Sequence, residues 1–81
     1  MKWIVTHSKD YPHRVGTGNA TPKEAQRFEE RWRTLDGDGN VFSFHGKCDR
    51  IGFLPLDKFC GPEVGDVEIQ FKDHDGKWRE L

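Results

Sequence analysis

Apolar and polar residues alternate most regularly near the C-terminal end of the chain, over residues 66–72. Val67, Ile69 and Phe71 are apolar, and the residues between them are polar. A period of two is typical of a β-strand with one buried face. We therefore expect a strand over residues 66–72 with Val67, Ile69 and Phe71 pointing toward a core.

Two turns rich in Asp and Gly join further strand-like runs. Residues 36–40, Asp-Gly-Asp-Gly-Asn, separate the aromatic and β-branched runs 32–35 and 41–44. Because glycine adopts left-handed conformations at little cost, this order predicts a β-hairpin. Residues 73–76, Asp-His-Asp-Gly, predict a second tight turn, after which residues 77–81 return as a last strand.

The first of these turns also resembles a calcium-binding loop of the EF-hand type. Asp36, Asp38 and Asn40 fit the first three ligand positions of such a loop. The sixth position, which needs glycine, is Val41, and the twelfth, which needs a bidentate glutamate, is Lys47. The hairpin interpretation is therefore preferred.

The remaining segments predict one helix and several shorter features. Thr21 can cap a helix, Pro22 suits its first position, and Glu24 completes a capping box, so we expect a short helix over residues 22–29. The other expected features are a strand over residues 2–6, a long surface loop over residues 7–20, a helical turn opened by Pro55 with Leu56 and Phe59 inward, and a break at Gly61-Pro62.

These elements predict one small α+β domain that spans residues 1–81. Its expected core is a twisted antiparallel sheet of four to five strands with one short helix on a face, and closure into a partly open barrel is an alternative. Only 33% of the residues are hydrophobic, so the three Trp, six Phe and one Tyr must supply much of the core. A domain this small would gain stability from a homodimer that covers a sheet edge.

The charge balance gives no sign of a nucleic-acid partner. Thirteen basic and fourteen acidic residues give a net charge of −1, whereas nucleic-acid binding requires a basic face. The sequence contains no apolar run long enough for a membrane span and no signal-peptide pattern. Two cysteines are too few for a disulfide framework, so we expect a cytoplasmic protein, acting in a host cell.

Two groups of residues suggest alternative functions. His45, Cys48 and Cys60 are residue types that bind zinc, but they form an incomplete ligand set, and packed free thiols are preferred over zinc or a Cys48–Cys60 disulfide. Basic residues also flank two tryptophans, which would suit base stacking; they are Arg31, Arg33, Lys77 and Arg79. Neighbouring strand residues face opposite ways, so we expect both tryptophans to face the core instead.

The order of these motifs resembles a group of small uncharacterised proteins of bacteria, their phages and mobile elements. The resemblance rests on Trp3-Ile4-Val5-Thr6, on the hairpin residues 32–41 with Gly46-Lys47, on residues 55–59 and on residues 69–78. It supplies no activity for any residue. It implies a context in which small accessory proteins bind and block a host protein, as anti-CRISPR proteins do.

We therefore expect a non-enzymatic protein-binding module with a host protein as its partner, and neither catalytic residues nor a cofactor. Cys with His is the only nucleophilic pair, and an aromatic-filled core in a chain this short leaves little volume for a catalytic pocket. Long loops often carry binding residues. The loop over residues 7–20 therefore makes Tyr11, His13 and Arg14 the expected contact residues. A small nucleic-acid-binding protein and a zinc-stabilised module are the alternatives.

Overall fold

The computed structural model describes residues 1–38 and 42–81 and confirms the α+β class. Within these residues, five strands form one antiparallel sheet: β1 (Trp3–His7), β2 (Glu30–Asp36), β3 (Phe42–Cys48), β4 (Asp66–Lys72) and β5 (Trp78–Glu80). Short helical segments are η1 (Pro12–Arg14), α1 (Pro22–Ala25), η2 (Leu56–Cys60) and α2 (Gly61–Val64). No helix in the described segments is long and apolar enough to cross a membrane.

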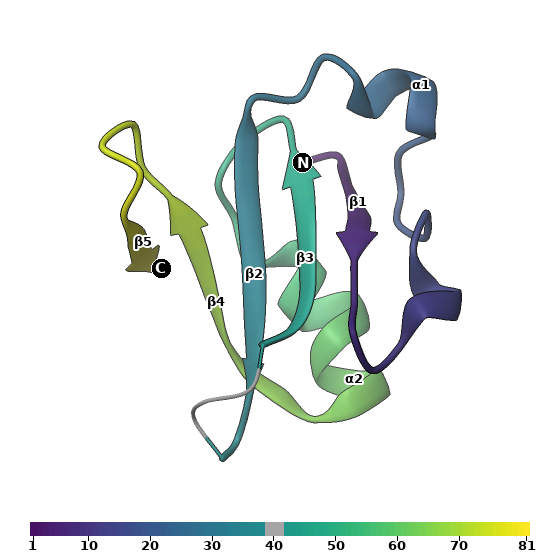
Figure 1. The fold of residues 1–81 in the computed structure, drawn as a ribbon, viewed down its shortest axis with the longest axis vertical. Coiled ribbons are helices and arrows are strands. Elements are labelled where there is room, and N and C mark those ends of the chain that lie inside the picture. The colour runs from purple at the N-terminus through teal and green to yellow at the C-terminus, as the bar shows by residue number, and fades with distance from the viewer. Residues whose placement is uncertain (39–41) are drawn as a thin grey trace.

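The sheet has the strand order β1-β3-β2-β4-β5 (Figure 1). Its central strand β2 pairs with β3 on one side and with β4 on the other. The strands β1 and β5 lie at opposite ends of this order, so the sheet is open and is not a closed barrel.

Both expected hairpins are present. β2 and β3 pair from Glu30 opposite Cys48 to Leu35 opposite Phe42, and the side chain of Asp36 accepts a hydrogen bond from the Asp38 amide (3.1 Å) at the start of the turn. Residues 39–41, which include two of the compared calcium-loop positions, lie outside the described part of the chain. In the second hairpin, the Asp73 carboxylate accepts hydrogen bonds from the Asp75 and Lys77 amides.

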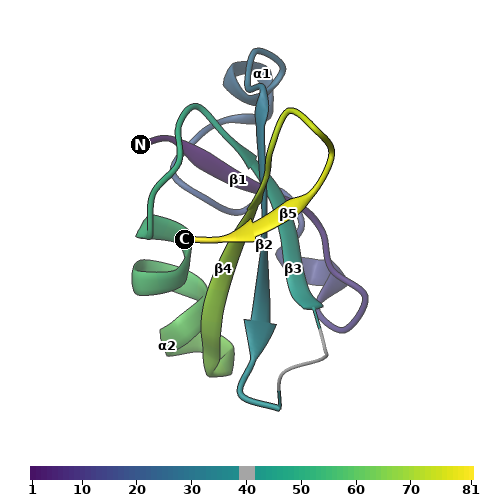
Figure 2. The same ribbon diagram turned by 90° about the vertical axis from the view of Figure 1, so that its left-hand side faces the viewer.

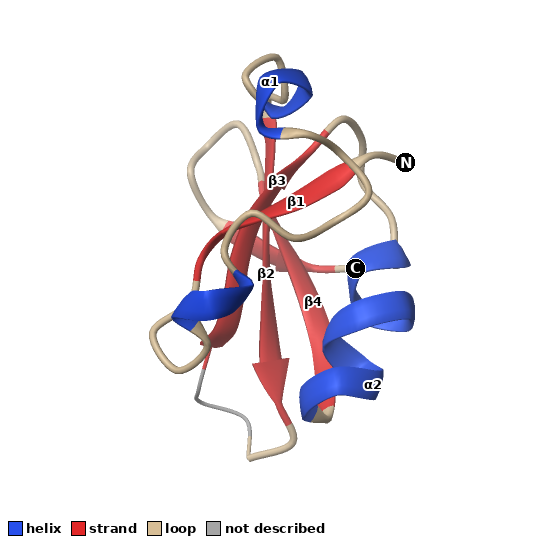
Figure 3. Ribbon diagram, turned by 90° about the vertical axis from the view of Figure 1, so that its right-hand side faces the viewer, coloured by secondary structure: helices blue, strands red, loops and turns tan. Residues whose placement is uncertain are grey.

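The core lies between one face of the sheet and the helical segment formed by η2 and α2 (Figure 3). Trp32 of β2 and Phe44 of β3 are fully buried in it, and the Trp32 indole donates a hydrogen bond to the Lys47 carbonyl (3.1 Å). The Trp3 ring meets the edge of Trp32 at 5.8 Å between ring centroids. As expected from the composition, aromatic rings supply much of the buried apolar surface.

The helices differ from the prediction. The capping box of Thr21 and Glu24 is present, but α1 ends at Ala25 rather than near residue 29. The longer helical segment runs from Leu56 to Val64, and Gly61-Pro62, where we expected a break, continues it as the first turn of α2. Pro62 lies at the start of α2, directly after the π-helical turn of η2. The segment ends at Gly65, which has a positive φ of 76°.

The expected direction of Val67 is wrong. Ile69 and Phe71 are buried as predicted, whereas Val67 is 67% exposed and Asp66 is buried instead. The register between β2 and β4 shifts between Leu35 and Asp36, which breaks the simple alternation at the start of β4.

The loop over residues 7–20 packs along the free edge of β1. Val5 donates its amide hydrogen bond to the Thr17 carbonyl (2.8 Å), and the Gly16 amide donates to the Val5 carbonyl (2.8 Å). Ile4 and Gly18 form an isolated bridge. The loop therefore covers much of one sheet edge, which leaves less of that edge available to a second chain.

Candidate functional site

The face of the sheet opposite η2 and α2 carries the most distinctive group of side chains, and we call it the outer face. Cross-strand pairing places its residues in rows. One row holds His7, His45, Arg33, Gln70 and Glu80. The next row holds Ile4, Lys47 and Arg31. The pair Lys72 and Trp78 extends the outer face on β4 and β5. Residues directly opposite one another on neighbouring strands lie about 5 Å apart, so adjacent members of a row are within contact distance.

Arg33 lies at the centre of the outer face between two aromatic rings. Its guanidinium carbon is 3.8 Å from the centroid of the Phe42 ring and 4.2 Å from that of Trp78. Its Nε donates a hydrogen bond to the Gln70 side-chain oxygen (2.8 Å), and the Gln70 amide nitrogen in turn donates to Glu68. These contacts fix the plane of the guanidinium, because stacking and a hydrogen bond act together.

The position of Trp78 contradicts the prediction that both tryptophans face the core. Trp32 does, but Trp78 is half-buried on the outer face, 6.2 Å from His45 between ring centroids. The reason is the register of the second hairpin. Trp78 is paired with Lys72, which follows the buried Phe71 and therefore faces outward. Figure 2 shows β5 as the strand nearest the viewer, crossing the directions of β4 and β2.

Two histidines extend the aromatic part of the outer face. His7 and His45 are cross-strand neighbours with ring centroids 5.8 Å apart. Burial lowers the pKa of His45 from its ordinary value, and the nearby charges of His7 and Arg33 lower it further. His45 is therefore neutral at pH 7, and its ring adds apolar surface beside Phe42 (5.9 Å).

Cations concentrate on the same face. Arg31 and Lys47 lie directly opposite each other, and Lys72 and Arg33 are close by. None of these four side chains forms an ion pair within the described residues, whose salt bridges are Lys2–Glu24, Arg14–Glu63, His74–Asp75 and Arg79–Asp73. The overall charge of −1 thus hides a local excess of positive charge.

The structure separates the four residues considered for nucleic-acid binding. Arg31 and Arg33 share the outer face, as period-two alternation predicts. Arg79 is paired with Phe71, so it points to the other side of the sheet, where its Nε donates to the Asp73 carboxylate (2.9 Å). Lys77 lies in the turn of the second hairpin.

The three zinc candidates do not come together. His45 is on the outer face, whereas Cys48 and Cys60 are free thiols buried in the core on the opposite side of the sheet. Across residues 1–38 and 42–81, no group of three or more His, Cys, Asp and Glu side chains is close enough to hold a metal ion. Burial raises the pKa of each thiol to about 12, so neither is a thiolate at neutral pH.

Two of the three contact residues expected in the loop already contact other parts of the protein. Tyr11 stacks on the core residue Phe44, with 5.4 Å between ring centroids. Arg14 forms an ion pair with Glu63 of α2 (3.0 Å), and this pair ties the loop to the helix. His13 is exposed within η1. Of the three, His13 is the side chain most free to meet a partner.

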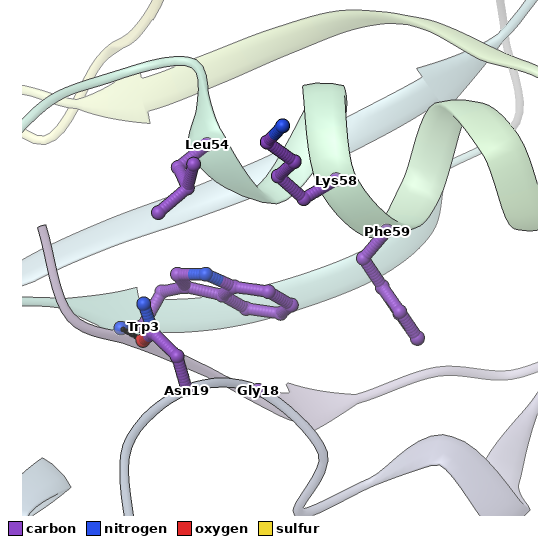
Figure 4. A pocket seen from close by; sticks show the side chains of 6 residues that line it. All are labelled: Trp3, Gly18, Asn19, Leu54, Lys58 and Phe59. Atoms are coloured by element: carbon purple, nitrogen blue, oxygen red, sulfur yellow. Dashed lines mark hydrogen bonds between the residues drawn. The ribbon is translucent and has the colours of Figure 1, made fainter.

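A hollow of about 300 Å³ lies between the loop and the helical segment, where Trp3, Leu54, Phe59 and Lys58 line it with Gly18 and Asn19 (Figure 4). The Asn19 side chain is already occupied, because it accepts a hydrogen bond from the Trp3 amide (2.7 Å) and donates one to the Met1 carbonyl (2.9 Å). Two polar groups of the lining, the Lys58 amine and the Trp3 indole nitrogen, have no such partner among the described residues. The hollow therefore offers less for specific recognition than the outer face.

Sequence reasoning missed the outer face because its members are far apart along the chain. The expected turn at residues 73–76 gave no signal of it, because it would place Trp78 opposite the buried Phe71, whereas the hairpin pairs Trp78 with Lys72. The structure thus identifies the outer face as the strongest candidate site. Comparison of the chain with models of protein families, with curated proteins and with solved structures found no match.

Proposed function

We propose that this protein is a non-enzymatic protein-binding module and that the outer face of its sheet is the binding surface. The observation behind the proposal is the Arg33 cluster, which we define as Arg33, Phe42, His45, Gln70 and Trp78. Arginine and large aromatic residues are the types that contribute most to binding energy at protein interfaces. Here they are packed together and still reach the surface.

The outer face suits a partner better than the loop does. Tyr11 and Arg14 already have internal partners in Phe44 and Glu63, so a bound protein would compete with these contacts. The cluster instead holds its side chains in place without covering them, since Arg33 and Trp78 are half-buried and Phe42 is 36% exposed. Side chains that are already fixed lose less entropy when a partner binds.

The chemistry of the described residues favours binding over catalysis. The two thiols are protonated and buried, and His45, the imidazole nearest to the cluster, lies on the opposite side of the sheet from both. A nucleophile and its base must be within hydrogen-bond reach of each other. We propose a host protein as the partner, and for this partner class the resemblance to small proteins of phages and mobile elements is the support.

The test is capture of a partner from a lysate of the natural host, compared between matched variants. The double variant Arg31→Ala/Lys47→Ala removes two cations from the outer face. The control, Lys23→Ala/Arg27→Ala, removes the same residue types from exposed positions in and next to α1. We expect the wild type and the control to capture the same protein and the outer-face variant to lose it.

Other outcomes point elsewhere. Loss of capture in His13→Ala/Arg14→Ala, with the outer-face variant unaffected, would assign binding to the loop. Equal recovery by all variants, or no recovery by any, would contradict the proposal.

A nucleic acid is the second candidate, favoured by the cations Arg31, Lys47 and Lys72. It predicts a salt-sensitive shift of single-stranded DNA that the same outer-face variant abolishes.

A further inference from the structure

The guanidinium of Arg33 is held in one orientation but keeps its terminal donors free. The Phe42 and Trp78 rings flank it, and Gln70 binds its Nε at 2.8 Å. The terminal nitrogens, Nη1 and Nη2, have no hydrogen-bond partner among the described residues. An arginine presents these two nitrogens as a planar fork that matches both oxygens of a carboxylate.

The orientation of Gln70 is fixed as well. Its amide nitrogen donates to Glu68, which leaves its oxygen to face Arg33. Glu68 therefore binds Gln70 and forms no ion pair with the guanidinium, so its charge acts on Arg33 only at longer range. A charge that is partly desolvated without a counter-ion gains more from an incoming anion than a fully hydrated one does.

The surroundings of Arg33 also attract negative charge. Arg31 and Lys47 lie opposite each other in the neighbouring row, and Lys72 of β4 continues that row. Glu68 and Glu80 are the acidic residues placed among these cations. The outer face thus has four cations against two acids, in a chain whose net charge is −1.

From this geometry we infer that the outer face binds an acidic segment of a partner protein, with one carboxylate held by Nη1 and Nη2 of Arg33 and a further one near Arg31 and Lys47. The inference rests on the proposed function and specifies the partner's chemistry. A nucleic acid fits less well. The guanidinium covers one face of both Phe42 and Trp78, and His45 packs against both rings, which removes surface that bases need for stacking.

The test is an NMR titration of the isotope-labelled full chain with a capped, glutamate-rich peptide. The matched probe is the same peptide with glutamine in place of each glutamate, and oligothymidylate is the nucleic-acid probe. We expect the glutamate peptide to shift the Arg33 Nε–H signal and the outer-face amides, and the glutamine peptide to leave them in place. Arg33→Lys should weaken binding about tenfold, because an ammonium group does not offer the planar fork.

Arg79→Lys is the matched control, since Arg79 points away from the outer face and binds Asp73. It should leave the affinity for the glutamate peptide unchanged, and both variants should keep the native amide spectrum. Equal affinity of wild type and Arg33→Lys would overturn the inference, as would tighter binding of oligothymidylate at the same residues. Outer-face shifts with both peptides would overturn the carboxylate preference and leave the proposed function standing. The absence of shifts with either would contradict the inference, and partner capture tests the function independently.

Discussion

Gly46 offers the sharpest test of how this sheet is packed. It lies in β3 between Val5 of β1 and Trp32 of β2, and the Trp32 indole fills the space that a side chain would occupy. A β-carbon at this position would overlap two atoms of the indole ring, Cε2 and Cζ2, and also the Ile4 carbonyl oxygen. The substitution Gly46→Ala therefore forces either the ring or strand β1 to move.

The cost follows from what must move. A tryptophan buries up to about 200 Å² of surface, so complete displacement of Trp32 would forfeit about 5 kcal/mol. A partial shift within the core costs about 1–3 kcal/mol, as other overpacked cores do. The lower entropy of the unfolded alanine chain returns about 0.4–1 kcal/mol. We expect the free energy of unfolding to fall by about 3 kcal/mol, which corresponds to a decrease in Tm of more than about 12 °C for a domain of this size.

Urea unfolding followed by tryptophan fluorescence measures this loss, because Trp32 is fully buried in the native state. Gly37→Ala is the matched control. It adds the same methyl group where no atom lies within 4 Å and φ is not positive, so it should change stability by less than about 1 kcal/mol. In a Trp32→Leu background, Gly46→Ala should cost less, because the overlapping ring is gone. A loss below about 1 kcal/mol for Gly46→Ala, or the same loss in both backgrounds, would refute this account of the packing.

Three further substitutions or reactions have defined outcomes. Burial raises the pKa of Asp66 above its ordinary value of 3.8, so the native state binds its proton more tightly than the unfolded state and stability falls as pH rises through that window. Asp66→Asn should therefore be the more stable form at neutral pH and should flatten this part of the pH dependence, measured by urea midpoints from about pH 4 to about pH 7. Cys48 and Cys60 should react with a thiol reagent at least about 100-fold more slowly in the native protein than in urea, followed by absorbance. Lys47→Glu should raise the free energy of unfolding by about 0.5 kcal/mol, because it places opposite charges across from Arg31. It should also weaken binding of the glutamate-rich peptide; unchanged binding would place the acidic segment elsewhere.

The strands could be predicted because their signals are local. Alternation over residues 66–72 and the Asp-Gly turns are both contained within a few neighbouring residues, and each selects one backbone geometry. The capping box at Thr21 is equally local, and it too is present. These features depend on residues that are adjacent in the chain, so they could be predicted from the sequence alone.

The errors at Gly61-Pro62 and at Val67 arise from distant contacts. Gly61-Pro62 is a strong breaker by composition, yet the segment from Leu56 to Val64 is helical, and Cys60 within it is buried against the sheet. Val67 fits the alternation, but the register shift against β2 turns Asp66 inward, where it accepts a hydrogen bond from the Ser43 hydroxyl (2.6 Å). Neither packing partner is visible in the local pattern.

The candidate site required the register of several strand pairs at once. Arg33, Phe42 and Trp78 lie on three strands, and only the combined pairings bring them onto one face. A shift of one residue in any of these pairings would move a side chain to the opposite side of the sheet. The composition of the site was visible in the sequence, whereas its assembly depends on long-range pairing.

The placement of charge on the outer face is the strongest reason to regard it as functional. Elsewhere in the described chain, some cations form ion pairs with acids, as Lys2 does with Glu24 and Arg14 with Glu63. On the outer face, Arg31 faces Lys47 directly, an arrangement that lowers stability in an isolated sheet. An acidic partner would convert this repulsion into attraction, so the cost exists only in the unbound protein. A surface that binds a partner is expected to carry such unfavourable charge pairs, although they lower the stability of the unbound protein.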